Sequence, residues 1–213
     1  MPKSDDDAPV EIRDVWAYNL EAEFAVIHEV VDEFPFVALD TEFPDVAIRP
    51  LGDFKTVANH NYHIIRANVD LLHLIQMGLT FSEATGNHPL SYQQPALLRE
   101  SGIDLVKNRE EGVDAERFAE LLMSSGVVLN DSVSWVTFHC AYDFEYLLKL
   151  LTCTKLPDTR EGFFELVRLF FPVVYDIKHL LKYSNSLHSG LNKVAEQLEV
   201  ERVGICHQAG SDI

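Results

Sequence analysis

Two carboxylates in an apolar setting are the first residues of the chain that could do chemistry. Asp40 and Glu42 lie in the segment VALDTEFP, where Val37, Leu39 and Phe43 surround them. Alternate side chains of a β-strand share a face, so both acids would point the same way. Two like charges side by side in a buried strand are unfavourable unless something neutralises them, as a divalent cation with oxygen ligands would. The alternative is a strand end where one carboxylate is solvated and the other caps a backbone group.

A third acid follows the apolar residues of SWVTFHCAYDFEYLL. The pattern predicts a strand that ends at His139, then a turn, and then a helix that Asp143 opens. A carboxylate in the first turn of a helix is favoured by the helix dipole, so the segment alone favours a simple cap. Asp176, at the end of the apolar run FFPVVYD, is an alternative ligand and otherwise a hydrogen-bonded structural aspartate.

The segment GICHQAGSDI holds a histidine and a further aspartate. His207 precedes Asp212 by five positions, with Gly210 between them. This spacing fits a histidine on a loop followed by an aspartate at the start of a helix, because Gly-Ser-Asp is a reasonable helix start. An isolated histidine is usually a surface or packing residue, so this segment by itself says little.

Strands separated by helices surround these residues and predict an α/β domain. Phe36 to Phe43 is an apolar run between prolines and predicts a buried strand. Further strands are predicted within 72–81, over 133–139 and over 173–177. Helical patterns cover 20–33, with Asn19 as the N-cap, and then 58–71, 96–100, 115–124, 142–151, 162–171 and 191–198. The polar stretch 82–95 predicts a loop.

The composition is that of one acidic globular domain. The chain has 213 residues, of which 47% are hydrophobic and 24% charged. Its longest apolar stretches are interrupted and too short for a membrane span, and its acidic N-terminus is no signal peptide. An odd count of cysteines without a C-x-x-C pair predicts neither a disulfide framework nor a cysteine zinc site, and favours a reducing intracellular compartment. We interpret Cys140 and Cys206 as packing residues rather than nucleophiles.

The net charge of −17 argues against a passive nucleic-acid binder, because such proteins usually carry a basic surface. An acidic protein can still act on RNA if bound divalent cations supply the local positive field. It would then hold its substrate weakly and need recruitment by a partner. The alternative is that the charge serves solubility alone.

Four stretches of the chain stand out together: LDTEFP, NHNYHIIRANVDLLHLIQMGLTF, FAELLMSSGVVLNDSVSWVTFHCAYDFEYLLKLLT and ERVGICHQAGSD. They resemble the poly(A) deadenylase subunit of the Ccr–Not complex, known as the CCR-four-associated factor one or Pop-two family of DEDD exonucleases. The resemblance covers most of residues 11 to 212, and the wording is closest to plant members.

The resemblance implies an RNase H-like α/β fold, a mixed sheet flanked by helices, over residues 12–213 after an acidic flexible tail at 1–11. By the family pattern, Asp40 and Glu42 match the first motif, Asp143 the second and Asp212 the last. These four would hold two divalent metal ions, Mg or Mn, with His207 as the catalytic proton acceptor.

The implied activity is 3′-to-5′ exonuclease shortening of mRNA poly(A) tails with release of AMP, in the nucleus and cytoplasm. The implied partners are single-stranded poly(A) RNA, a Not-type scaffold subunit and a partner deadenylase, with no membrane. A more distant reading is a related DEDD nuclease that acts on DNA or structured RNA.

The chain departs from the family pattern at two segments. After Phe81 the family carries a longer insert with a further strand, so we expect an edge strand of the sheet to be missing. The family also continues beyond the last aspartate with C-terminal helices, so we expect a domain that is incomplete there. The alternative function is therefore a weakly active or inactive scaffold-binding module of the same complex. Asp45, Cys140 and Glu145 stand where small residues are usual, and we expect Asp45 and Glu145 to be solvated.

Overall fold

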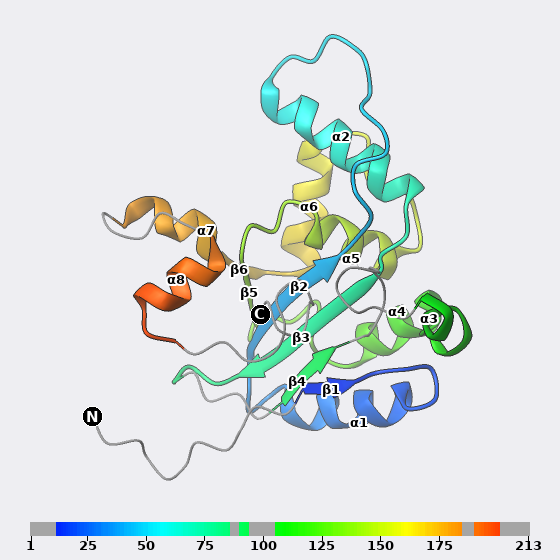
Figure 1. Cartoon of the computed structure of the whole chain (residues 1–213), viewed down its shortest axis with the longest axis vertical. Coiled ribbons are helices and arrows are strands. Elements are labelled where there is room, and N and C mark those ends of the chain that lie inside the picture. Colours follow the sequence, from blue (N-terminus) through cyan, green and yellow to red (C-terminus); the bar gives the residue numbers. More distant parts are fainter. Residues whose placement is uncertain (1–11, 86–89, 94–104, 185–189, 201–213) are drawn as a thin grey trace.

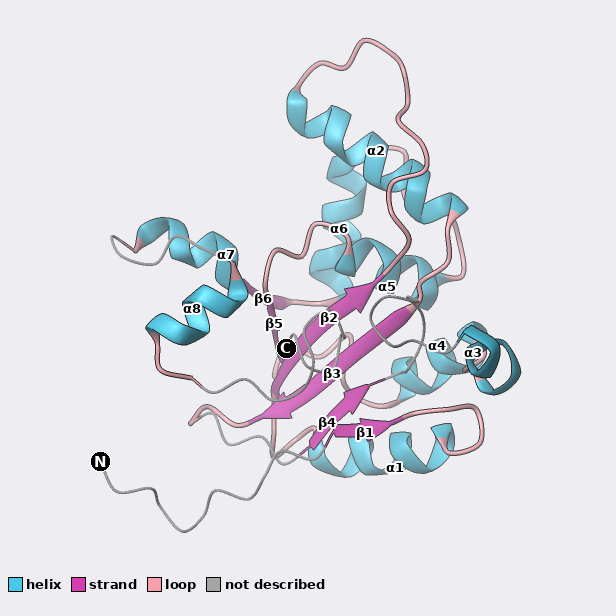
Figure 2. Ribbon diagram, in the orientation of Figure 1, coloured by secondary structure: helices cyan, strands magenta, loops and turns pink. Residues whose placement is uncertain are grey.

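Within the residues that the structure describes, six strands form one mixed sheet (Figures 1 and 2). The computed structural model describes residues 12–85, 90–93, 105–184 and 190–200. The strands are β1 (Ile12–Asp14), β2 (Phe36–Glu42), β3 (Gln76–Ser82), β4 (Leu90–Gln93), β5 (Ser134–Thr137) and β6 (Val173–Asp176). Their order across the sheet is β1-β4-β3-β2-β5-β6.

Strand β2 lies inside the sheet, antiparallel to β3 and parallel to β5. Strand β6 pairs with β5 in parallel, so the carboxyl ends of β2, β5 and β6 meet at one edge of the sheet. On the other side, β4 is antiparallel to β3, and β1 is parallel to β4. In open α/β sheets, ligands bind outside the carboxyl ends of parallel strands, so this edge is the natural place for a site.

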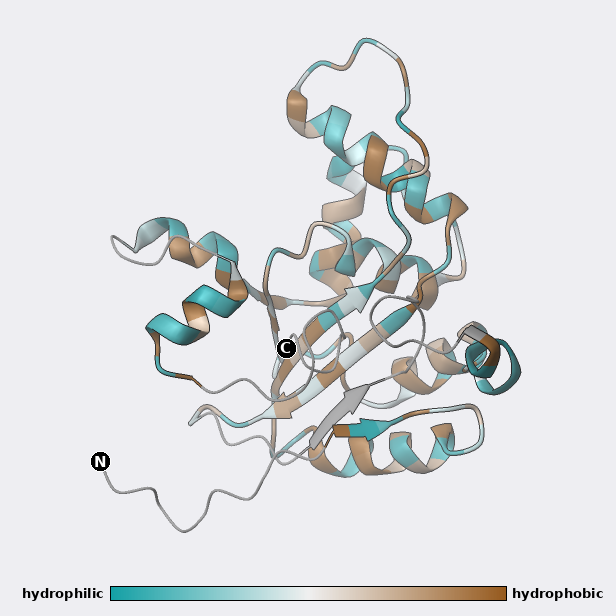
Figure 3. Ribbon diagram, viewed as in Figure 1, coloured by the Kyte–Doolittle hydropathy of each residue, from teal (hydrophilic) through white to brown (hydrophobic). Residues whose placement is uncertain are grey.

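The two faces of β2 differ as its alternating pattern requires. Val37, Leu39 and Thr41 are buried, whereas Asp40 and Glu42 lie on the opposite face and are half-buried. Strand β3 is buried along its whole length except at Ser82, as expected for a strand covered on both faces. In Figure 3 the hydrophobic colour of β2 gives way to hydrophilic colour towards its C-terminal end.

Helices pack around the sheet and one another. They are α1 (Leu20–Val30), α2 (Val57–Leu71), α3 (Leu105–Glu111), α4 (Ala115–Ser124), α5 (Asp143–Thr152), α6 (Arg160–Phe170), α7 (Ile177–Leu180) and α8 (Leu191–Gln197), with a short 3₁₀ turn at Leu181–Tyr183. Helix α5 contacts β2, α2, α4 and α6, so it connects the sheet to the outer helices. Helix α2 lies beyond the C-terminal end of β2 (Figure 1).

Side-chain caps fix where several helices begin. The hydroxyl of Thr56 accepts a hydrogen bond from the backbone N–H of Asn59 at α2, and Thr159 accepts one from Gly162 at α6. Asp114 accepts one from the N–H of Arg117 at α4.

None of the described helices is long and apolar enough to span a bilayer.

The predicted α/β class with a mixed, helix-flanked sheet is confirmed, and the predicted helices and strands match the structure closely at most positions. Asn19 stands at the N-cap of α1 as predicted. Its side chain makes no capping bond to a backbone N–H of the helix and instead accepts from the N–H of Trp16, 2.7 Å away. The short elements β1, α3 and α7 carry no clear periodic signal and were not predicted.

The loop predicted over 82–95 is wrong at its end, because Leu90–Gln93 forms β4. This strand bridges β3 and β1 through hydrogen bonds on both of its sides. The expectation of a missing strand on this side of the sheet is therefore not met. The expected N-terminal tail at 1–11, the helix at 96–100 and the C-terminal residues from 201 lie outside the described residues.

Candidate active site

Asp40 and Glu42 occupy the C-terminal end of β2, at the edge where the parallel strands end. Their cross-strand partners on β3 are Gly78 and Gln76 respectively. Because glycine has no side chain, Gly78 leaves the space beside the carboxylate of Asp40 free of a cross-strand neighbour. The prediction that both acids share one face of a strand is confirmed by the alternating burial of β2.

Asp143 is tied to this strand by a hydrogen bond between two distant parts of the sequence. The hydroxyl of Thr41 donates to Oδ1 of Asp143 at 2.5 Å, and both side chains are buried. Thr41 is the residue between Asp40 and Glu42 in the sequence. Its hydrogen bond therefore fixes Asp143, the first residue of α5, to the residue that separates the two acids. Thr41 lies on the buried face of β2, and the two acids lie on its half-buried face.

Aromatic packing holds the segment after Glu42 against α5. The ring of Phe43 stacks on Tyr142, with ring centroids 4.7 Å apart, and on Tyr146, at 5.2 Å. Stacked rings of this kind contribute beyond their buried area. The hydrogen bond at Thr41 and this stack together fix the end of β2 relative to the first turn of α5.

Asn68 holds the loop that leaves the site. This fully buried side chain of α2 accepts hydrogen bonds from the N–H groups of Ala47 and Ile48, at 2.7 and 2.9 Å. Its amide donates to the carbonyls of Ile48 and Ile64, both at 2.7 Å. The chain that follows Glu42 is therefore anchored to α2.

Burial raises the pKa of Asp143 to about 6, while the hydrogen bond from Thr41 opposes this rise. A buried carboxyl is stabilised in its charged form by a nearby cation. The site carboxylates offer only oxygen ligands, which suit Mg²⁺ and Mn²⁺. Within the described ranges, no three His, Cys, Asp or Glu side chains are arranged to hold a metal ion. Mg²⁺ needs only one or two carboxylates, with water and substrate phosphate as its other ligands, so the residues fit such an ion.

Asp176 has the structural role that the sequence offered as one of two alternatives, beside that of a metal ligand. Its Oδ1 accepts hydrogen bonds from the backbone N–H of His139, at 3.1 Å, and of His179, at 3.2 Å. It caps α7 and fixes the turn after β5, where His139 has a left-handed backbone with φ of 71°. The thiol of Cys140 donates to its Oδ2 at 3.6 Å.

Cys140 is a packing residue, as predicted. Burial raises the pKa of its thiol to about 12, so the reactive thiolate is suppressed at neutral pH. Cys206, interpreted in the same way, lies outside the described residues.

The expectation that Glu145 is solvated is wrong. Its side chain is only 6% exposed, because α2 and α6 cover the first turn of α5, and burial holds its pKa well above the ordinary value. Its Oε2 has no hydrogen-bond partner among the described residues. Asp45 is exposed, as expected.

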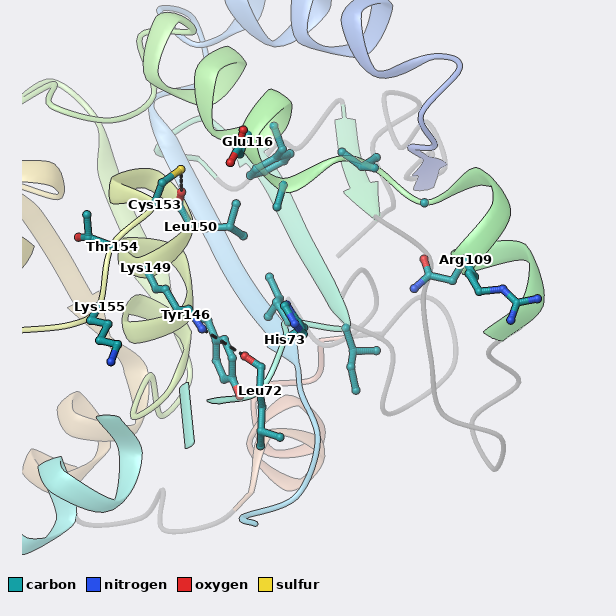
Figure 4. A pocket seen from close by; sticks show the side chains of 17 residues that line it. Leu72, His73, Arg109, Glu116, Tyr146, Lys149, Leu150, Cys153, Thr154 and Lys155 are labelled. Atoms are coloured by element: carbon teal, nitrogen blue, oxygen red, sulfur yellow. Dashed lines mark hydrogen bonds between the residues drawn. The ribbon is translucent and has the colours of Figure 1, made fainter. Parts of the chain in front are cut away.

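A cavity of about 710 Å³ lies between α3, α4, α5 and the segment before β3 (Figure 4). Lys149 and Tyr146 project into it from α5, but the ammonium of Lys149 already donates to the carbonyls of Val69 and Leu72. Of the predicted site residues, the three that the structure describes, Asp40, Glu42 and Asp143, do not line this cavity. The candidate site at the end of β2 is therefore separate from it.

Most of the chain matches a known family of nucleases. Residues 15–96 and 99–209 match the model of the CAF1 family ribonuclease. The chain belongs to this family. The predicted resemblance is confirmed, and its plant-like character agrees with 56% identity to the probable CCR4-associated factor 1 homolog 7 of Arabidopsis thaliana, over 97% of this chain and 84% of that protein. Poly(A) ribonuclease pop2 of Schizosaccharomyces pombe is 42% identical, over 94% of this chain and 65% of its own length.

Solved CAF1-type structures share the fold. The structure of S. pombe Pop2p in its Mg²⁺- and Mn²⁺-bound form matches with a TM-score of 0.89 and 42% identity, over 94% of this chain and 87% of that chain. A chain in the structure of the yeast NOT1 MIF4G domain co-crystallized with CAF1 matches with a TM-score of 0.79 and 33% identity, over 94% and 83%. The RNase H-like α/β class is thus confirmed. The Mg²⁺ and Mn²⁺ of the Pop2p structure are the divalent metals that the resemblance implied.

The structure places three of the five predicted site residues of this CAF1 ribonuclease. It brings Asp143 to the strand that carries Asp40 and Glu42, whereas His207 and Asp212 lie outside the described residues. Sequence reasoning missed Thr41, the residue that orients Asp143. Its position between two acids was visible in the sequence, but its partner lies 102 residues away.

Proposed function

We propose that this CAF1 ribonuclease is a 3′-to-5′ exoribonuclease that shortens mRNA poly(A) tails and releases AMP. The observation that carries the proposal is the Thr41–Asp143 hydrogen bond, which joins two acidic motifs distant in sequence. The similarity to poly(A) ribonuclease pop2 supports poly(A) as the substrate.

In this proposal, Asp40, Glu42, Asp143 and Asp212 hold two divalent cations, Mg²⁺ or Mn²⁺. Bound cations of this kind lower the pKa of water and neutralise charge on the phosphate and on the departing 3′ oxygen. The imidazole of His207 accepts the proton of the attacking water. Thr41 keeps the Asp143 carboxylate in one orientation, so little rearrangement is needed when substrate binds.

We further propose that the chain works as the catalytic subunit of the Ccr–Not complex in mRNA turnover, in the nucleus and cytoplasm. The co-crystal of NOT1 with a similar CAF1 chain supports a Not-type scaffold as partner, and a partner deadenylase completes the proposal. Recruitment by a scaffold also suits the net charge of −17, which disfavours unaided binding to RNA.

The test is a shortening assay with 5′-labelled poly(A) RNA and the purified chain. With Mg²⁺ or Mn²⁺ we expect a ladder of shorter RNAs and AMP as the product, and with excess EDTA no shortening. Asp40→Ala should abolish shortening, while Asp53→Ala, an exposed acid on the following loop, should leave it unchanged. Equal activity of wild type and Asp40→Ala would refute the proposed site.

A second candidate is a scaffold-binding module that does not turn over RNA. It is favoured by the lack of a three-ligand metal group among the described residues. This reading predicts that the chain captures a Not-type MIF4G domain in a pull-down but shortens no RNA with any divalent ion. The enzyme reading predicts that both wild type and Asp40→Ala are captured, and that only the wild type is active.

A further inference from the structure

The proposed reaction makes no use of the cavity of about 710 Å³ between α3, α4 and α5. This cavity is open to solvent, because Arg109, Glu116, Cys153, Thr154 and Lys155 line it and all of them are exposed. A ligand that enters the cavity can therefore contact these side chains directly. The volume falls in the range of cavities that bind specific ligands.

The lining of the cavity is basic, although the chain as a whole is acidic. Three cations, Arg109, Lys149 and Lys155, line it, and Glu116 is the one carboxylate among the described lining residues. The whole chain has the opposite balance, with 17 Lys and Arg against 34 Asp and Glu. A local excess of positive charge favours anionic ligands at this place and disfavours cationic ones.

The three cations have N–H donors to give to a ligand. The side chains of Arg109 and Lys155 make no ion pair or hydrogen bond with any residue in the described part of the chain. Lys149 uses two of its three N–H donors on the carbonyls of Val69 and Leu72 and keeps the third. Guanidinium and ammonium groups with free donors bind carboxylates through charge-assisted hydrogen bonds.

The floor between the cations is apolar. Leu74, Ile75 and Leu150 line it and are half-buried, so part of each side chain is accessible to a ligand. In Figure 4 Arg109 and Lys155 lie on opposite sides of the cavity, with Leu150 between them. The cavity therefore presents positive charge at two separated places and apolar surface in the middle.

This arrangement favours a peptide over a small anion or a nucleic acid. A compact anion such as phosphate reaches only one of the two charged sides. A nucleobase needs an accessible ring to stack on, but Phe118 and Tyr146 are only 7% and 2% exposed, which leaves His73 as the exposed ring of the described lining. A peptide can carry separated acidic side chains with an apolar side chain between them.

We infer that this cavity is a docking site for an acidic peptide segment of a partner protein, in which apolar residues stand between acidic ones. The acidic side chains pair with Arg109 on one side and with Lys149 and Lys155 on the other. The apolar residues between them cover the floor at Leu150. This site goes beyond the proposed function, because docking there needs neither divalent cations nor RNA.

The test is fluorescence anisotropy with the full chain in EDTA, which removes metal-dependent binding at the catalytic carboxylates. The probe is a labelled peptide in which a pair of leucines stands between two pairs of glutamates. One control peptide has glutamines in place of the glutamates, and the other has serines in place of the leucines. We expect the probe to bind about tenfold more tightly than either control, since each control lacks one kind of contact.

Variants assign the charged contacts. Arg109→Ala combined with Lys155→Ala should bring the preference for the probe over the glutamine peptide close to one. Lys182→Ala combined with Lys193→Ala removes two exposed cations that do not line the cavity, so this matched control has the same net charge and should keep the preference. Thermal melting of both double variants checks that they are folded.

Glu116→Gln provides a test in the opposite direction. It removes the carboxylate that repels an acidic peptide, so the probe should bind about threefold more tightly than to the wild type. A variant that fails to fold cannot produce such a gain.

Two further arms separate this site from the proposed reaction and from RNA binding. Asp40→Ala should bind the probe as the wild type does, so the docking site stands even if the chain shortens no RNA. Labelled oligoadenylate in EDTA should bind more weakly than the probe. The inference is overturned if the probe does not bind, if the folded Arg109 and Lys155 double variant keeps the full preference, or if oligoadenylate binds more tightly than the probe and loses this binding in the same variant.

Discussion

Thr41 and Asp143 are 102 residues apart in the chain, and a hydrogen bond of 2.5 Å joins their side chains. The valine side chain has nearly the shape of threonine but cannot donate. Thr41→Val should therefore leave the fold intact and reduce the rate of poly(A) shortening by about ten- to hundredfold, the equivalent of one lost hydrogen bond to a charged group. Thr41→Ser keeps the donor and should remain close to wild type. A wild-type rate in Thr41→Val would show that this bond does not orient Asp143.

Asp176 lies near the site but acts as a hydrogen-bond acceptor for backbone N–H groups. Asparagine keeps an oxygen acceptor there, so Asp176→Asn should shorten poly(A) within about threefold of the wild-type rate, whereas loss of a metal ligand lowers activity by orders of magnitude. The measurement is the initial rate at saturating Mg²⁺. An inactive but folded Asp176→Asn would indicate that Asp176 is a metal ligand.

The two cysteines that the structure describes differ sharply in environment. Burial raises the pKa of Cys140 to about 12, and Cys153 is exposed at the end of α5. Because only the thiolate reacts, and a raised pKa keeps the thiol protonated below that pH, Cys140 should be alkylated far more slowly than Cys153 at pH 8. Peptide mass spectrometry after timed iodoacetamide treatment measures both rates. Preferential labelling of Cys140 would indicate an activated thiol.

At the scale of elements, the position of the site depends on how the loop after β2 is held. Asn68 of α2 holds this loop through three hydrogen bonds and makes a fourth to the carbonyl of Ile64 within its own helix. Asn68→Ala should lower the free energy of unfolding by about 2 kcal/mol, because water compensates only part of the loss at this buried position. Urea unfolding measures the change, with Asn59→Ala on the first turn of α2 as the control. A loss no larger than that of the control would contradict the anchoring role.

The elements that the sequence predicted are those with enough residues to show a period. Strand β2 combines apolar alternation with flanking prolines, and α4 has a cap at Asp114 and a continuous apolar stripe. Strand β4 could not be predicted, because Leu90–Gln93 is short and mostly polar and becomes a strand through pairing with β3 and β1. Pairing of this kind depends on tertiary context and leaves little trace in local sequence.

At the scale of the molecule, the candidate site was predictable in its residue types but only partly in its surroundings. Asp40 and Glu42 lie in an apolar strand, where their charges need a neutralising partner. This need could be predicted from the local sequence alone. That Asp143 reaches the same strand depended on the family resemblance. Glu145 was misjudged because acids in a first helical turn are usually solvated, and only the packing of α2 and α6 reveals its burial.

The net charge of −17 gives the whole chain a repulsive field for RNA, so the positive charge that attracts the phosphate has to come from bound cations. The most direct test is a titration of Mn²⁺ into the full chain, with the free ion followed by its electron paramagnetic resonance signal. The account predicts about two bound ions per chain, as a two-metal site requires, with at least one lost in Asp40→Ala and both retained in Asp53→Ala. No bound Mn²⁺ in the wild type, or identical binding by Asp40→Ala, would contradict it.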